Sequence, residues 1–166
     1  KSRYWGSEGG EDATGEYYGW SIPWHTRNTA LTDALTKLGV GRRVQAEFLA
    51  DGQRVLKDLV VTAAPPDYKS APAWKWTAGG ISVCNLTDDV RETLALEDDA
   101  PGVVVCGRES GSRAVVAGIR PYEIITSVDG APVKSVEEFE KAVTGRQEAR
   151  FDVLRLTTTR TVNVKY

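Results

Sequence analysis

The sequence predicts an α+β fold in which short strands, tight turns and capped amphipathic helices alternate. Three observations predict it. Apolar and polar residues alternate in several short runs, which is typical of half-buried strands. Asp-Gly pairs at 51–52 and 129–130 follow such runs, as in β-hairpins. The order helix, glycine, strand, turn, strand occurs twice, over 29–61 and 135–165, which indicates two copies of one module.

The first copy is predicted to be incomplete. Its helix follows Asn28-Thr29, carries Leu31, Leu35 and Leu38 at helical spacing and ends at Gly39. Two strands then flank the first Asp-Gly turn. Only 27 residues precede the helix, so this copy is either truncated or strongly diverged. They are rich in Gly, Trp and Tyr and include one short predicted strand, residues 17–22.

Three segments therefore divide the chain. Residues 1–62 form the partial first unit. Residues 63–77 are rich in Pro, which removes amide donors and favours extended backbone, and so indicate a stiff linker. Residues 78–166 form the second domain.

The second domain contains strands, short helices and one clearly capped helix. Ser135 is a good N-cap, Glu138 follows it as in a capping box, and Gly145 ends the helix. The other predicted elements are strands over 80–86, 102–106, 123–128, 150–156 and 160–165, a helix over 88–96 and a helical turn over 112–117.

Composition excludes several classes of function. The 166 residues carry 21 basic and 23 acidic side chains, without the concentrated basic face that nucleic acid needs. No apolar run is long enough to span a membrane. Cys84 and Cys106 are interpreted as two separate buried side chains, with one disulfide as the alternative. With His25 as the sole histidine, we expect no metal site and no cofactor.

Several patterns could suggest other activities, and each has a simpler interpretation. Ser7 and His25 lack the surroundings of a hydrolase triad, so no catalytic residue is assigned. The acidic pairs at 88–89 and 98–99 are expected to cap a helix and to solvate a turn. Trp74 and Trp76 are expected to anchor the linker on the domain rather than to stack on a sugar. The triplet at 85–87 matches a glycosylation site, a pattern that often occurs by chance.

The second domain resembles a PDZ domain of the type found in HtrA-like (Deg-type) serine proteases. The resemblance rests on several motifs that occur in the expected order: Gly102-Val-Val-Val, Gly111-Ser112, Ala117-Gly118-Ile119-Arg120-Pro121, Ile124-Ile125, Val128-Asp129-Gly130, Pro132-Val133 and Ser135-Val136-Glu-Glu-Phe139. It implies a small, partly open β-barrel or sandwich capped by two helices. Residues 29–61 are similar to the last third of a preceding PDZ domain.

Two departures from the family pattern fall in turns. Arg113 replaces the usual Pro, and Tyr122-Glu123 replaces Gly-Asp before a strand. Both are expected to affect the type of turn more than the fold.

The resemblance implies a peptide-binding site. In this family a peptide adds as an extra strand between one exposed strand and a helix. The loop before that strand is residues 78–81, whose N–H groups at Gly79, Gly80 and Ile81 are expected to bind a terminal carboxylate. Gly79 stands where the family has a bulky apolar residue, so we expect a larger or weaker pocket beneath the loop.

Two walls are expected for this groove. One is the strand face of Ile81 and Val83, with Ser82 on the opposite face. The other is the helix, through Val136, Phe139 and Val143, with Glu140 near the rim. An apolar stripe at helical spacing is by itself more typical of core, and the loop and helix together favour a groove.

These observations favour a peptide-binding module. The resemblance implies the regulatory or substrate-docking part of a periplasmic or secreted HtrA-like protease, with a linked protease domain. The partners would be peptide C-termini or unfolded protein segments. The alternative is a structural or assembly protein whose groove is vestigial or is filled by its own chain, for which residues 17–22 are the candidate.

Overall fold

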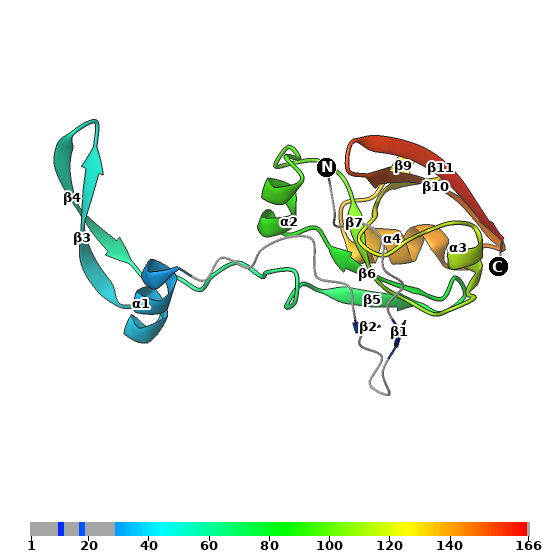
Figure 1. The fold of residues 1–166 in the computed structure, drawn as a ribbon, viewed down its shortest axis with the longest axis horizontal. Coiled ribbons are helices and arrows are strands. Elements are labelled where there is room, and N and C mark those ends of the chain that lie inside the picture. The colour runs from blue at the N-terminus through cyan, green and yellow to red at the C-terminus, as the bar shows by residue number, and fades with distance from the viewer. Residues whose placement is uncertain (1–9, 12–16, 19–28, 166) are drawn as a thin grey trace. The chain divides into compact units, whose positions relative to one another are not determined.

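The computed structural model describes residues 10–11, 17–18 and 29–165. Within this part the chain forms two compact units, which divide after Pro65. Each unit has its own sheet (Figure 1). The two units are described separately below.

The unit after Pro65 contains an antiparallel sheet in the order β11-β10-β8-β7-β6-β5, with β9 paired to β8 (Figure 1). The predicted strands are present, and β5 and β9 are additional. The strands are β5 (Ala73–Trp76), β6 (Ile81–Asn85), β7 (Val103–Arg108), β8 (Ile124–Val128), β9 (Ala131–Pro132), β10 (Glu148–Arg155) and β11 (Thr158–Lys165). The sheet does not close into a barrel, because in the described chain β5 and β11 each have one neighbour.

Three helices accompany this sheet: α2 (Asp88–Thr93), α3 (Arg113–Val116) and α4 (Val136–Val143). α4 begins as predicted, because the Ser135 hydroxyl accepts the Glu138 N–H and the Glu138 carboxylate accepts the Lys134 N–H. The same hydroxyl also lowers the pKa of Glu137 by hydrogen bonding. α2 is shorter than predicted, because Ala95 has φ +50°, outside the helical region.

The main core lies between α4 and the sheet. Phe139 and Phe151 stack with ring centroids 5.8 Å apart, and Trp76 meets both rings edge to face. β-branched residues of β6, β7, β8 and β10 complete this cluster. A smaller cluster, centred on Tyr68, Val90, Val104 and Ile124, lies beneath α2, and burial raises the pKa of Tyr68.

The turn before β8 contains Tyr122 and Glu123, two residues that depart from the family pattern. Tyr122 has φ +65°, the left-handed region that glycine would adopt more easily. Glu123 is fully buried, accepts the Arg120 N–H and pairs with the Arg160 guanidinium at 2.7 Å. The Tyr-Glu pair therefore forms a tight turn that ends in a buried ion pair.

The unit before Pro66 contains α1 (Ala30–Leu38) and a hairpin of β3 (Arg43–Ala50) and β4 (Gln53–Val60) (Figure 1). The helix follows Asn28-Thr29 as predicted, and Thr29 is its N-cap. The hairpin turns at Asp51-Gly52, both with positive φ. No residue of α1 is buried. Elsewhere, β1 (Gly10–Glu11) pairs with β2 (Tyr17–Tyr18).

Two sequence predictions are wrong. Residues 73–76 were assigned to the linker but form β5, because Trp74 and Trp76 lie on one face of an extended segment that packs against Phe139. Cys84 and Cys106 are joined by a disulfide, with Cα atoms 5.9 Å apart. The register between β6 and β7 shifts after Ser82, which leaves Cys106 unpaired in the ladder and beside Cys84.

Candidate functional site

The site predicted from the sequence is the edge of β6 that faces away from β7. Residues Ile81–Asn85 form β6 and pair with β7 on one side. On the other side β5 pairs antiparallel with β6, with Trp74 opposite Val83 and Trp76 opposite Ile81. The open edge expected from the sequence is therefore occupied by the chain itself.

α4 packs against both β5 and β6. The Asn85 side chain joins β6 to the start of this helix, because its Oδ1 accepts the Val136 N–H at 2.8 Å. This bond fixes the separation of strand and helix at one end. The Asn85 of the glycosylation-like triplet thus has a structural role.

The two tryptophans of β5 occupy the space beside α4. Trp76 is 3% exposed, and its indole lies 6.0 Å from the Phe139 ring and 5.4 Å from the Phe151 ring, measured between centroids. Trp74 is half-buried, and its centroid lies 6.1 Å from that of Phe139. The tryptophans therefore anchor residues 73–76 on the domain, as the sequence predicted for the pair.

The glycine loop differs from its predicted form. A Cβ on Gly79 would overlap the Trp76 indole, so Trp76 fills the space in which a side chain at position 79 would lie. The expected larger pocket is absent for this reason. The Gly80 N–H donates to the Trp76 carbonyl at 2.8 Å, so the expected set of three free N–H groups is also not formed.

The other predicted site residues divide by burial. The apolar members lie in the main core: Ile81, Val83, Val136, Phe139 and Val143. Ser82 is partly exposed and Glu140 is exposed. The structure thus brings these residues together around β6 and α4, with β5 covering the strand edge between them.

Charged groups near β5 are sparse. The Lys75 Nζ lies 2.8 Å from the Glu109 carboxylate, and both side chains are more than half exposed. The described residues contain no group of three or more His, Cys, Asp and Glu side chains that could hold a metal ion. Ser7 and His25 lie outside the described residues. The N-cap of α2 is Thr87, which makes no side-chain capping bond, and Asp88 and Asp89 are the first residues of the helix instead of its cap. The Asp89 carboxylate accepts the Tyr68 N–H at 3.3 Å.

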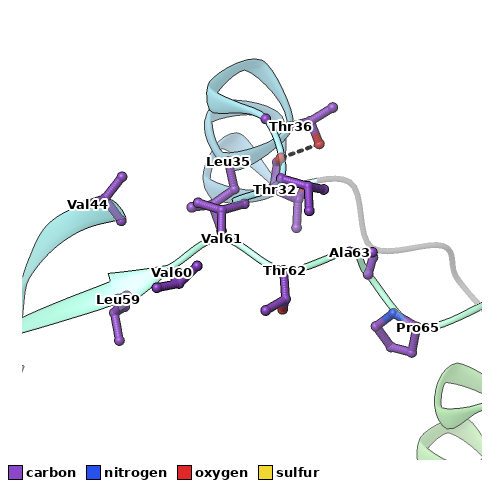
Figure 2. A pocket seen from close by; sticks show the side chains of 13 residues that line it. Thr32, Leu35, Thr36, Val44, Leu59, Val60, Val61, Thr62, Ala63 and Pro65 are labelled. Carbon is purple, nitrogen blue, oxygen red and sulfur yellow. Dashed lines mark hydrogen bonds between the residues drawn. The ribbon is translucent and has the colours of Figure 1, made fainter. Parts of the chain in front are cut away.

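A hollow of about 610 Å³ lies within the unit before Pro66. Figure 2 shows Leu35 of α1 and Val61 after β4 next to each other at this hollow. Most of its lining is apolar, and no charged side chain contributes to it. It therefore offers apolar surface without groups for acid–base chemistry.

Comparison with known proteins identifies the family. The PDZ domain family matches residues 80–166, which is more than half of the chain. The chain belongs to the PDZ domain family. The PDZ domain comprises β6 to β11 with α2, α3 and α4, and β5 directly precedes the matched region.

Relatives of the chain include proteins named as probable periplasmic serine endoproteases, DegP-like. Those of Chlamydia trachomatis serovar D and Chlamydia muridarum are each 30% identical over 115 residues, 69% of this chain and 22% of the relative. The chain thus spans about a fifth of the length of these relatives.

Solved structures with a similar fold include the HtrA-type protease AlgW with a decapeptide, at 23% identity and a TM-score of 0.44 over 58% of this chain and 29% of that one. A variant of the same protease matches with a TM-score of 0.48 over 57% of this chain and 28% of that one. The match to the PDZ family and the DegP-like relatives together show that this chain resembles the PDZ regions of such proteases. No described helix is both long and apolar enough to cross a bilayer.

Proposed function

We propose that the PDZ domain docks extended peptide segments by strand addition to β6, beside α4. The observation that carries this proposal is β5 itself. An extended segment pairs antiparallel with β6 and places alternate side chains against α4. Strand addition needs this combination of a ladder edge and an adjacent apolar wall.

The proposed contacts follow the predicted site residues. The backbone of Ile81, Ser82 and Val83 provides the ladder, and Gly79 and Gly80 form the turn at its end. The helix wall consists of Val136, Phe139 and Val143, with Glu140 at its exposed rim. A peptide orders several residues for a small buried area, so we expect micromolar affinity at best, about −8 kcal/mol.

The hydrogen bonding of the Gly79-Gly80 turn favours extended internal segments over free C-termini as ligands. Carboxylate binding needs several unoccupied N–H groups, and the Gly80 N–H is bonded to the Trp76 carbonyl. A peptide held mainly by the ladder gains little from a terminal charge. We therefore expect the acid and amide forms of one peptide to bind with similar affinity.

A suitable probe is a synthetic peptide with the sequence of residues 70–77, here called the β5 peptide. On adding it to the ¹⁵N-labelled chain, we expect amide shifts in β6 and α4, of similar size for its acid and amide forms. A loss of most of the affinity in the amide form would instead support capture of the carboxylate. If neither form shifts β6 amides, in the wild type or in a chain with a weakened β5, the docking function is refuted.

In the whole protein we propose that this domain is the regulatory or substrate-docking part of a DegP-like serine protease. The relatives' names and the PDZ match support this assignment. The Cys84–Cys106 disulfide favours an oxidising compartment such as the periplasm or the outside of the cell. The partners would be unfolded protein segments and a linked protease domain.

One observation favours a second function, that of an assembly module. β5 covers the edge of β6 with the chain's own residues, as would be expected of a groove that no longer takes ligands. Binding of the β5 peptide distinguishes the two functions, because only the docking function requires an exchangeable edge.

A further inference from the structure

The two ends of β5 are held by different contacts. At its downstream end the Trp76 ring is buried between Phe139 and Phe151, and its carbonyl closes the turn with the Gly80 N–H. At its upstream end Ala73 and Lys75 are exposed and Trp74 is half-buried. Further upstream, Ala71 and Tyr68 are each 9% exposed, and the Tyr68 N–H donates to an Asp89 carboxylate oxygen at 3.3 Å, so this end leaves β6 only when these contacts are released. Residues 61–67, which precede them, have no regular structure.

We propose that residues 72–75 are a built-in competitor for the β6 edge, and that ligands bind by replacing them while Trp76 stays in place and Tyr68 and Ala71 are released together with the strand. This inference rests on the docking function proposed above and adds its regulation and its ligand class. The ligands are extended segments with a bulky apolar residue followed directly by a basic one.

The exchange preserves the contacts that residues 72–75 make with β6 and α4. The Asn85 N–H donates to the Pro72 carbonyl at 2.9 Å, and a ligand carbonyl can accept the same bond. The residue opposite Val83 would place its side chain on Phe139, where the Trp74 ring now lies 6.1 Å away. An exchange of equivalent strands leaves no buried backbone group without a partner.

The ligand chemistry follows from the side chains that it replaces. A bulky apolar residue fills the place of Trp74, because a small one would leave the face of Phe139 open. The next residue lies in the place of Lys75, opposite Ser82 and 2.8 Å from the Glu109 carboxylate. A basic side chain there recovers the ion pair that Lys75 gives up.

The tether makes β5 an effective competitor. A covalently linked strand acts at an effective concentration in the millimolar range, far above that of a free peptide. The apparent affinity for a ligand is therefore reduced to the fraction of chains in which residues 72–75 have left the edge. Weakening the upstream end should raise that affinity without changing the site that receives the ligand.

The test compares binding of the β5 peptide to the wild-type chain and to Trp74→Ala. We expect the variant to bind the peptide about tenfold or more tightly. Leu156→Ala is the matched control, because it also shortens a partly exposed apolar side chain, in the turn between β10 and β11, and should leave the affinity unchanged.

A charge reversal provides a second variant that leaves the packing of β5 intact. Lys75→Glu places a carboxylate beside Glu109, and we expect an increase in affinity of about twofold to threefold, since an exposed pair contributes little. Lys165→Glu is its matched control, because Lys165 forms a similarly exposed pair with Glu148 at the other edge of the sheet.

Peptide variants test which of the two tryptophan positions in the β5 peptide contributes to binding. Alanine in place of the residue equivalent to Trp74 should abolish binding to the Trp74→Ala chain. Alanine in place of the residue equivalent to Trp76 should change the affinity for that chain less than about threefold. The reverse order would overturn the proposal, because it would mean that the Trp76 position is exchanged.

Amide exchange tests the opening without any ligand. The Asn85 N–H bonds to Pro72 at the upstream end of β5, and the Gly80 N–H bonds to Trp76 at the downstream end. We expect Asn85 to exchange with solvent about tenfold or more faster than Gly80. Equal exchange rates would show that β5 opens as one piece and would overturn the partial exchange.

The binding outcomes separate the two proposals. Tighter binding by Trp74→Ala and Lys75→Glu, with unchanged controls, supports the built-in competitor. Equal binding by all chains, with amide shifts in β6, overturns the competitor and leaves the docking function standing. An absence of binding in every chain overturns both.

Discussion

The α4–β10–β11 region and the α1–β3–β4 region are built from the same elements in the same order, but only the first buries its apolar side chains. In both, a capped helix leads into a hairpin of two eight-residue strands. Phe139 of α4 is fully buried, whereas Leu31 of α1 is 67% exposed. The helix and hairpin thus form from local signals, while their burial depends on other strands.

The partners of the buried region show what provides that burial. β10 pairs with β8 as well as with β11, and α4 packs against β5 and β6. In the described chain β3 pairs only with β4. The side chains exposed as a result include Leu38, Val40, Phe48, Leu49, Leu56, Leu59 and Val60.

Substitution in the two helices should give the largest difference between the regions. Phe139→Ala removes a ring packed against Trp76 and Phe151 and should lower the free energy of unfolding of the PDZ domain by about 3–5 kcal/mol. Leu31→Ala, the control in α1, should change the free energy of unfolding by less than about 0.5 kcal/mol. Denaturant unfolding followed by tryptophan fluorescence measures both. Equal costs would mean that the α1 face is covered in solution.

Local features of both regions could be predicted from the sequence. The helix caps at Thr29 and Ser135 and the Asp-Gly turns after Ala50 and Val128 are all present. Each depends on residues within a few positions of one another, and their side chains or backbone preferences satisfy local hydrogen bonds. The order of strands in the PDZ domain followed from spaced motifs of the same kind.

The features that the sequence did not reveal depend on distant residues. Nothing near Trp74 and Trp76 indicates a strand, because the neighbouring prolines favour a linker. The surface for these rings comes from Phe139 and Phe151, each over 60 positions away. A glycine at position 79 leaves room for the Trp76 indole, but this relation can be recognised only once the position of the indole is known. The disulfide likewise required a register shift between β6 and β7 that spacing does not predict.

Removal of the disulfide should have the next largest effect on the free energy of unfolding, and it should affect only the PDZ domain. Cys84 and Cys106 are 22 positions apart, and a bond that closes a loop of this size contributes about 3 kcal/mol. The double variant Cys84→Ala, Cys106→Ala should lower the unfolding free energy of the PDZ domain by that amount. The amide exchange of β3 and β4 should not change, because that unit contains no cysteine. Faster exchange there would mean that the two units are stabilised together.

The smallest expected effect on stability comes from Asp152, a carboxylate in β10 that accepts hydrogen bonds from the two neighbouring strands. Asp152 accepts hydrogen bonds from the Ser127 hydroxyl of β8 at 2.6 Å and from the Thr161 hydroxyl of β11 at 2.8 Å. These bonds lower the pKa of Asp152 below its ordinary value of 3.8. The equivalent place in the other hairpin holds Glu47, which lies opposite Leu56 instead of a threonine.

The sign of the pH dependence follows from the direction of that shift. A carboxyl group whose pKa is lower in the folded chain stabilises the fold above its unfolded pKa, and this contribution is lost as the pH falls through the folded value. Wild type should therefore be more stable than Asp152→Asn at neutral pH, and the difference should narrow below about pH 4. Thr161→Val removes one of the two donors. In that background, Asp152→Asn should therefore lower the stability at neutral pH by less than it does in the wild type, but the loss should not vanish. A gap between wild type and Asp152→Asn that stays constant down to about pH 2 would show that the hydrogen bonds from β8 and β11 do not favour the ionised form.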